Sequence, residues 1–331
     1  RRSSDLDKEG RKTGHRFVRG LMGSHAKLSY EQAQAAIDGQ PDDTTGPIME
    51  AILYPLWNAY HAMLKGRLKR SPLQIESAER RIRMAPDGGI ASIEKRASLE
   101  AHRLIEEFMI LANAAAAEML EKKALPLIYR VHDEPSQEKV HNLQEFLKTL
   151  DLPFTKQGAL RPAQFNRVLA QVSGEDYEPL VNEVVLRSQA QAEYSAENYG
   201  HFGLNLRRYA HFTSPIRRYA DLIVHRALTR ALGLGEGALP ADESVETLAE
   251  IAAQISVTER RAMKAERETT DRLIAQSIAA TYGLRLALDC GEGQRSQLLV
   301  QDKTDFAFLK ERAEAVGYEF RVLMGEVYFG P

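Results

Sequence analysis

The chain has a single cysteine, Cys290, among its 331 residues. One thiol can build neither a disulfide framework nor a zinc site of several cysteines, and this scarcity is typical of a reducing cytoplasm. No apolar run approaches the roughly 18 residues that a membrane span needs, so no membrane partner is expected. The N-terminal residues are polar and lack the apolar core of a signal peptide. Because there is also no initiator methionine, we expect the sequence to begin inside a longer protein.

The chain also has almost no net charge. Its 44 lysines and arginines are balanced by 46 aspartates and glutamates, which leaves −2 at neutral pH. Bulk charge therefore does not indicate nucleic-acid binding, and any electrostatic contact with RNA must come from a local concentration of cations. The 44% hydrophobic content is typical of a globular protein, and the length allows one or two domains.

A local concentration of cations is present in the segment 205–230, which begins NLRRYAHFTSPIRRYADLIVHRAL. It contains one acid, Asp221, interleaved aromatic residues and six arginines, which are Arg207, Arg208, Arg217, Arg218, Arg226 and Arg230. Guanidinium groups bind phosphate oxygens in pairs and aromatic faces stack on bases. The pattern therefore favours a single-stranded nucleic acid or another polyphosphate. A helix with a solvated basic face is the alternative.

Pro215 predicts where a helix starts within this segment. Proline suits the first turn of a helix, where its missing N–H costs nothing, so we predict a helix over 216–233 with Ser214 or Thr213 as its N-cap. This start would place Arg217 in the first turn together with Arg218, where free backbone N–H groups also favour an anion.

Hydrophobic periodicity predicts a helix-rich α+β chain. Helices are predicted at 30–38, 48–70, 98–120, 136–149, 162–172, 176–189, 216–233 and 244–281. Strands are predicted at 16–22, 73–76, 80–84, 90–94 and 127–132, with turns at DKEG and PDGG. Residues 284–331 change character and predict a small β-α-β-β unit with strands at 298–301, 318–323 and 326–331 and a helix at 304–316.

The run GHFGLNLRRYAHFTSPIRRYADLIVHR (200–226) resembles the signature of the ribonuclease II / ribonuclease R (RNB) exoribonuclease family. Further stretches resemble this family in the same order and spacing, at 15–39, 102–113, 127–136, 160–169 and 182–195. The resemblance implies a partial RNB-type catalytic domain, a sheet with packed helices truncated at its N-terminus, over residues 1–283. It also implies processive 3′→5′ hydrolysis of single-stranded RNA to nucleoside 5′-monophosphates by a cytoplasmic, monomeric protein.

Residues 284–331 form a second segment, because an OB-fold domain would be expected there from the family and is not found. This tail faintly resembles part of phage tail-hub or late-control proteins. A phage structural or interaction protein is therefore one alternative function, and a non-catalytic RNA-binding module is another.

The resemblance implies three catalytic residues. Arg217 aligns with a family arginine that contacts RNA phosphate near the metals, and it would stabilise the charge of the transition state. Glu107 would be a carboxylate near the 3′ end of the RNA, and Glu266 matches a glutamate near the RNA path. A structural ion pair for Arg217 and a surface acid for either glutamate remain open. Glu107 shares an apolar helix stripe, but the sequence does not decide whether it or Glu106 faces the site.

The same resemblance implies further contacts with RNA. These are expected from Arg208, His211, Arg218, Tyr219, Arg226 and Ile75. Ile75 stands where the family has an aromatic residue that stacks on a base; an aliphatic residue can still pack there, but the stacking contribution of roughly 1–3 kcal/mol per base is weakened.

The family also implies Mg²⁺ held by a cluster of aspartates, which the chain lacks. A D-x₅-D-x-D-D run is absent, and the nearest acids, Asp5 with Asp7 and Asp42 with Asp43, have neither its spacing nor its surroundings. We therefore expect no metal ligands in this chain and a cluster upstream of residue 1, which leaves activity of the chain alone open. Three histidines, His201, His211 and His225, lack the spacing of a zinc site.

Overall fold

The computed structural model divides into two compact units, Arg1–Ile75 with Ala97–Val257 and Glu76–Arg96 with Thr258–Pro331. The residues that it describes are 2–75, 80–84, 90–95, 98–154, 158–281, 285–288, 304, 307, 309–310, 313–314, 319–323 and 326–330. Within them no helix is both long and apolar enough to cross a membrane. The predicted division into residues 1–283 and 284–331 remains a prediction.

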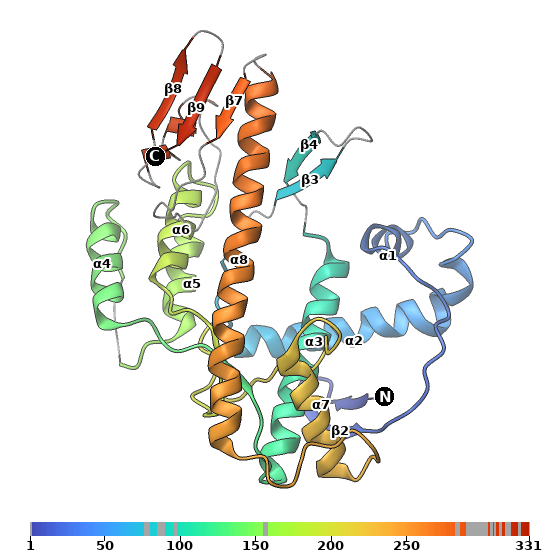
Figure 1. Ribbon diagram of the computed structural model, residues 1–331. Coiled ribbons are helices and arrows are strands. Elements are labelled where there is room, and N and C mark those ends of the chain that lie inside the picture. The colour runs from blue at the N-terminus through green and yellow to red at the C-terminus, as the bar shows by residue number, and fades with distance from the viewer. Residues whose placement is uncertain are drawn as a thin grey trace. The chain divides into compact units, whose positions relative to one another are not determined.

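Helices make up most of the first unit (Figure 1). They are α1 (Tyr30–Ile37), α2 (Tyr54–Arg70), α3 (Glu100–Lys122), α4 (Gln137–Lys148), α5 (Pro162–Gln171), α6 (Glu178–Ser188), α7 (Tyr219–Leu232) and the start of α8 (Val245–Thr281). The strands form two antiparallel pairs, β1 (Arg2–Leu6) with β2 (Lys12–Phe17) and β5 (Tyr129–Val131) with β6 (Glu193–Ser195). The helix-rich α+β prediction is confirmed.

Most predicted helices are present to within about two residues, but four local predictions were wrong. The strand predicted at 16–22 ends at Phe17, and residues 73–75 form no strand. The helix predicted at 48–70 begins with a π-helical turn, Met49–Leu53, before α2. The helix predicted to begin at residue 98 begins at Glu100, after its N-cap Leu99.

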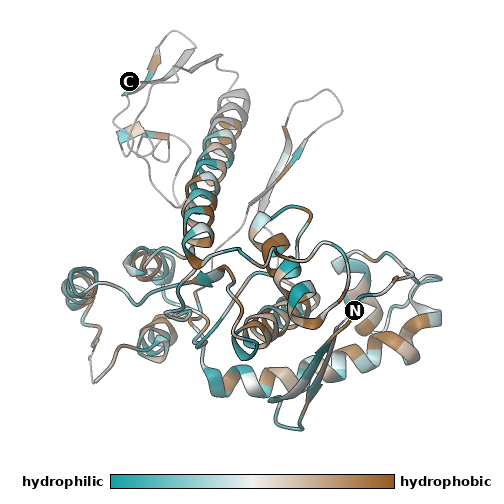
Figure 2. Cartoon of the chain, turned by 60° about the horizontal axis from the view of Figure 1, so that its bottom comes forward, coloured by the Kyte–Doolittle hydropathy of each residue, from teal (hydrophilic) through white to brown (hydrophobic). Residues whose placement is uncertain are grey.

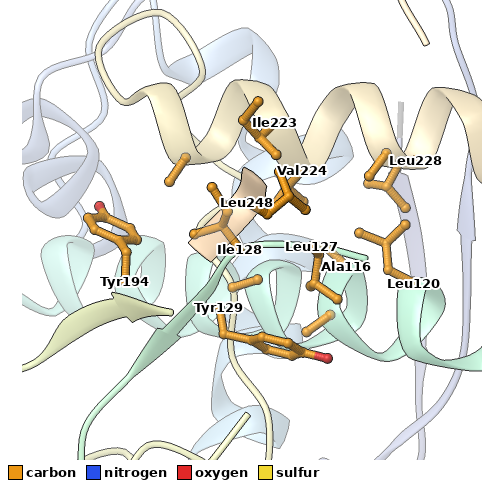
Figure 3. Close-up of a cluster of buried hydrophobic side chains, with 14 of the residues drawn as sticks. Ala116, Leu120, Leu127, Ile128, Tyr129, Tyr194, Ile223, Val224, Leu228 and Leu248 are labelled. Atoms are coloured by element: carbon orange, nitrogen blue, oxygen red, sulfur yellow. The ribbon is translucent and has the colours of Figure 1, made fainter. Parts of the chain in front are cut away.

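The main core of the first unit lies where α3, β5, α7 and the start of α8 meet (Figure 3). Ala115, Ala116 and Ala117 of α3 are fully buried, and their small side chains leave room for the apolar face of α7. That face includes Ile223 and Val224, each of which contributes about 1.5–3 kcal/mol by its burial. This core fixes the two elements that carry most of the candidate site.

Two of the smaller cores lie around α2 and around α4, α5 and α6. One joins α4, α5 and α6 around Leu147 and Phe165, and Ile75 packs against it. The other contains Trp57 and Tyr60 of α2, which confirms that both are core residues. Along α8, hydrophilic and hydrophobic residues alternate, as expected for a partly exposed helix (Figure 2).

The second unit is described in part. It contains an antiparallel pair, β3 (Arg80–Met84) with β4 (Ile90–Lys95). It also contains a three-stranded sheet in the order β7-β9-β8, from β7 (Arg285–Leu288), β8 (Glu319–Leu323) and β9 (Glu326–Gly330). The last two strands confirm the predictions at 318–323 and 326–331. The predicted PDGG turn, the strand at 298–301 and Cys290 lie outside the described residues.

The β1–β2 turn packs closely against α2, with Gly10 of the turn facing Ala62 and Gly66 of the helix. Asp7 accepts hydrogen bonds from the backbone N–H groups of Glu9 and Arg11, and this closes the predicted DKEG turn. Gly10 has a φ of +73°, and a Cβ on it would overlap the backbone carbonyl of Ala62 in α2. Only glycine therefore fits at this contact.

We expect Gly10→Ala to lower the free energy of unfolding by about 2 kcal/mol or more, because it adds steric overlap to backbone strain. Gly39→Ala is the matched control, since Gly39 also has a positive φ, +91°, but no atom lies within 4 Å of a Cβ there. Urea denaturation of both variants would measure the difference. Equal losses would contradict the contact with α2.

Candidate nucleic-acid interface

The arginine-rich segment folds as a braced loop followed by a helix. Its first part runs beside β5, where the backbone N–H of Arg130 donates to the carbonyl of Tyr209 over 2.9 Å. Pro215–Arg217 then form a turn, and α7 begins only at Tyr219. The predicted start at residue 216 was therefore wrong by three residues. Arg218 is the N-cap, with extended backbone, and Arg217 lies outside the helix.

The side chain of Asp221 explains this late start. Asp221 is fully buried and accepts a hydrogen bond of 2.7 Å from the backbone N–H of Ser214. The same carboxylate pairs with the guanidinium of Arg218, whose Nε lies 2.9 Å from Oδ2 and whose Nη2 donates to Oδ1 over 3.0 Å. An acid in the first turn of a helix also compensates the helix dipole. The loop is thus tied to α7 by one buried carboxylate.

Two further polar side chains hold the loop from other elements. Asn113 of α3, only 1% exposed, donates to the hydroxyl of Tyr209 over 2.8 Å and accepts from the backbone N–H of Phe212 over 3.0 Å. His225 of α7 bonds to the carbonyl of Phe212 at 2.8 Å and stacks on its ring. Asn113 was not among the residues predicted from the sequence, although an amide on an apolar helix stripe was the signal that could have found it.

The six arginines do not form one basic surface. Arg208 pairs with Glu121 at 2.8 Å, and Arg218 with Asp221. Arg226 and Arg230 donate to backbone carbonyls of the loop at 238–241. Arg217 and Arg207 are exposed, and neither has a side-chain hydrogen bond or ion pair within the described part of the chain. These two cations remain available to a phosphate.

The aromatic side chains of the segment are of two kinds, packed inside the protein or exposed to solvent. Tyr209 is buried and Phe212 packs against the main core, so neither presents its face to a base. Tyr219, at the start of α7, is 51% exposed, and Ile216 in the turn is fully exposed. These two side chains flank Arg217 and Arg218 in the sequence, and they are apolar surfaces on which a base could pack.

Three histidines, His132 buried and His201 and His211 partly buried, form a cluster with aromatic residues behind the loop. His132 lies 5.1 Å from His201, and Tyr209 lies 5.3 Å from His201 and 5.7 Å from His211 between ring centroids. Burial lowers the pKa of His211 to about 2, and Arg218 and Arg130 act in the same direction. Burial likewise lowers the pKa of His201 to about 3. His211, expected to contact RNA, is therefore neutral, with its Nδ1 2.9 Å from the hydroxyl of Tyr194.

His132 is satisfied by backbone groups on both ring nitrogens. Its Nδ1 accepts from the N–H of Gly203 over 2.8 Å, so its Nε2 donates to the carbonyl of Ala190 over 2.8 Å. Arg130 of β5 lies opposite Tyr194 of β6, and its guanidinium lies over the ring of that tyrosine. The histidines act in packing and bracing.

Glu107, rather than Glu106, faces inward from α3. The Glu107 side chain is 3% exposed and pairs with Arg67 and, at 3.5 Å, with Arg70. Glu106 is half exposed and lies 3.3 Å from Arg67. Burial opposes the charge of Arg67, but the two carboxylates outweigh it and raise its pKa. Glu107 is therefore the buried partner in ion pairs with two arginines.

The remaining predicted residues lie elsewhere. Glu266 is exposed on α8, in the second unit. Ile75 is partly buried against the core of α4, α5 and α6 in the first unit. Within the first unit, Ile75 packs with that core rather than with the turn that carries Arg217. Their roles in binding and catalysis stay predictions.

No group of three or more His, Cys, Asp or Glu side chains that could hold a metal occurs among the described residues. The nearest candidates have structural roles. Asp7 closes the β1–β2 turn, and Asp42 accepts from Thr44 and Thr45 in a turn before α2. Hydrogen bonds from Gln32 and Thr45 lower the pKa of Asp42 to about 2. The described donor set therefore does not fit a magnesium centre.

Comparisons with known proteins agree with this arrangement. The sequence model of the RNB domain matches residues 3–233. Ribonuclease R of Escherichia coli (strain K12) is 35% identical over 277 residues, which cover 81% of this chain and 34% of that protein. Ribonuclease R of Aquifex aeolicus is 35% identical over 279 residues, 84% of this chain and 39% of that protein. The chain thus spans little more than a third of these curated relatives.

A solved structure gives the same fold. RNase R of Mycoplasma genitalium, in complex with ribose-methylated single-stranded RNA, has a TM-score of 0.77 at 24% identity. The match covers 84% of this chain and 44% of that one. At this identity the likeness shows the fold alone.

We expect Asp221→Asn to destabilise the first unit by about 2 kcal/mol or more, because it leaves the Arg218 guanidinium without its counter-charge. Chemical denaturation would measure this loss. The double variant Arg218→Met, Asp221→Asn should be less destabilised than the sum of the single variants. Additive effects would contradict the proposed coupling between the two side chains.

The histidine cluster predicts a pH dependence. Unfolded histidines have a pKa of about 6.5, so the unfolded chain binds more protons below that pH than the folded chain does. The free energy of unfolding should therefore fall as pH drops from about 6.5 toward the folded value of about 3 for His201. Urea denaturation at pH 7 and pH 5 should show a smaller difference for His201→Gln than for the parent. If the parent and His201→Gln lost the same free energy of unfolding between pH 7 and pH 5, the lowered pKa of His201 would be refuted as the cause.

Proposed function

The chain belongs to the RNB family, and we propose that it forms the RNA-positioning part of a 3′→5′ exoribonuclease that acts on single-stranded RNA. The proposed products are nucleoside 5′-monophosphates. We further propose that the protein works as a monomer in the cytoplasm. The match of the RNB domain to more than half of the chain supports the family activity as a proposal for the whole protein.

One observation carries the proposal: Arg217 is exposed and unpaired at the tip of a rigidly braced turn. Before it, Asn113 and His225 bond to Phe212 and Asp221 to Ser214, and after it Asp221 bonds to Arg218, all through part-buried hydrogen bonds. Because the backbone of this turn is held, binding a phosphate has to order the side chain of Arg217 and not the loop that carries it. Arg217 is thus suited to hold a phosphodiester and to offset the charge that develops when the bond breaks.

Arg218 has a positioning role in this proposal. Its guanidinium is engaged by Asp221, so it fixes the start of α7 and thereby the direction of the Arg217 turn. Tyr219 is half exposed, and its ring can stack on a base next to the phosphate held by Arg217. Arg208, Arg226 and His211 support the loop from behind.

Mg²⁺ is the cofactor that we propose for the complete protein. It would supply the charge neutralisation that phosphodiester hydrolysis requires. The described residues offer no fitting ligand group, so their part in the reaction is to bind and orient the RNA. Glu107 and Glu266 are proposed to contact RNA, Glu107 through its pair with Arg67 and Arg70.

A non-catalytic RNA-binding module is the second candidate. The absence of a metal-binding carboxylate group among the described residues favours it for this chain taken alone. A time course on 5′-labelled single-stranded RNA, with Mg²⁺ or with EDTA, separates the two functions. Stepwise shortening of the labelled strand from its 3′ end only with Mg²⁺ would support the nuclease, and binding without any shortening would support the module.

We expect Arg217→Ala to weaken binding of single-stranded RNA about tenfold and to lower the slope of log K against log salt by about 0.7, because one phosphate contact is lost. Fluorescence anisotropy of a labelled oligonucleotide would measure both. Arg16→Ala removes the same charge from an exposed position on β2. It should change the RNA affinity and the salt slope by less than Arg217→Ala does. Equal effects of the two variants would contradict a specific phosphate contact at Arg217.

A further inference from the structure

A second cationic site lies within the first unit, at a cavity of about 410 Å³. Its wall comes from the β1–β2 turn, the second half of α2, one face of α3 and residues 205–208. No residue of the 213–219 turn is part of this wall, so the cavity is separate from the site proposed around Arg217.

The wall of the cavity is firmly built. The backbones of Gly10 and Gly66 lie so close that a Cβ on Gly66 would be 2.8 Å from the carbonyl oxygen of Gly10. On the other side, the amide of Asn205 donates to the carbonyl of Arg70 at the end of α2. Turn, helix and loop are thereby joined around one hollow.

Positive charge exceeds negative charge in this wall. Two carboxylates, Glu107 and Glu118, face six cations, which are Arg11, Lys12, Arg67, Arg70, Arg207 and Arg208. Three acids outside the wall also pair with its cations, Asp7 with Arg11, Glu106 with Arg67 and Glu121 with Arg208. Even with these acids counted, cations remain in excess.

Two guanidinium groups of the wall have unused donors. The Nε of Arg70 is buried without a hydrogen-bond partner, and its contact with Glu107 is long, at 3.5 Å. Burial lowers the pKa of Arg70, as expected for a cation that its surroundings do not fully compensate. Arg207 has no side-chain hydrogen bond or ion pair among the described residues. An anion between them would satisfy both groups.

The rest of the wall is apolar. It includes Met63, Ile110, Leu111 and Ala114. A hollow of this size that combines an apolar face with a few convergent polar groups is typical of small-molecule sites. The occupant should therefore carry an anionic group at one end and a flat, largely apolar body at the other.

We propose that this cavity binds a nucleoside 5′-monophosphate, with its phosphate between Arg70 and Arg207 and its base against the apolar wall. Arginine forks bind phosphate oxygens two at a time, and Arg is the residue best suited to such contacts. The proposal rests in part on the proposed nuclease function, because its ligand is the proposed product and Glu107, proposed to act at the RNA, belongs to the same wall. It makes no use of Arg217.

The test is calorimetric titration of the 331-residue chain with adenosine 5′-monophosphate in metal-free buffer. We expect saturable one-to-one binding that weakens as salt is raised, since screening reduces charge–charge attraction. Arg207→Ala should weaken this binding about tenfold. Because Arg207 is exposed and unpaired, the variant should fold normally. Arg16→Ala, which lies outside the wall, should bind as the parent does.

Two competing ligands and a second variant decide between occupants. Adenosine should bind much more weakly than the monophosphate, and inorganic phosphate should also bind more weakly because it cannot use the apolar wall. Ala114→Phe should reduce binding by filling the hollow without a change of charge. Equal affinity for adenosine, equal affinity for inorganic phosphate, or no effect of Arg207→Ala would each overturn the proposal. The RNA-binding test of Arg217→Ala is independent of these outcomes.

Discussion

The buried carboxylate of Asp221 is the interaction on which the candidate interface depends. It joins the backbone of Ser214, the guanidinium of Arg218 and the first turn of α7 in one contact that is closed to solvent. A buried charge without partners is very costly, so the loop and the helix keep this mutual arrangement. The position of the turn that carries Arg217 is a consequence of this arrangement.

The rest of the first unit supports this contact through α3. Its alanines allow α7 to pack closely, and its Asn113 bonds to the loop itself. One helix therefore both builds the core and positions the segment that we propose to bind RNA. The opposite face of the same helix carries Glu107, Leu111 and Ala114 to the cavity, where a second anion site is proposed.

Much of the fold was predictable from the sequence because its signals are local. The apolar stripe of residues 98–120, the capping serine at 136 and the DKEG turn each depend on neighbours within a few residues, and the corresponding elements are present. The late start of α7 was not predictable, since proline and serine signals favoured residue 216. The deciding hydrogen bond comes from a side chain that is buried only after the chain has folded.

The sequence by itself determined the family signature and the helix-rich composition of the fold, but it left open whether Glu106 or Glu107 faces inward. It also showed six arginines close together in the chain, but only the tertiary structure decided which of them are available. Arg208, Arg218, Arg226 and Arg230 are engaged by acids or carbonyl groups, and Arg207 and Arg217 have no such partner among the described residues. Adjacency in the chain places charges near one another, whereas pairing requires a partner at hydrogen-bond distance, which packing supplies.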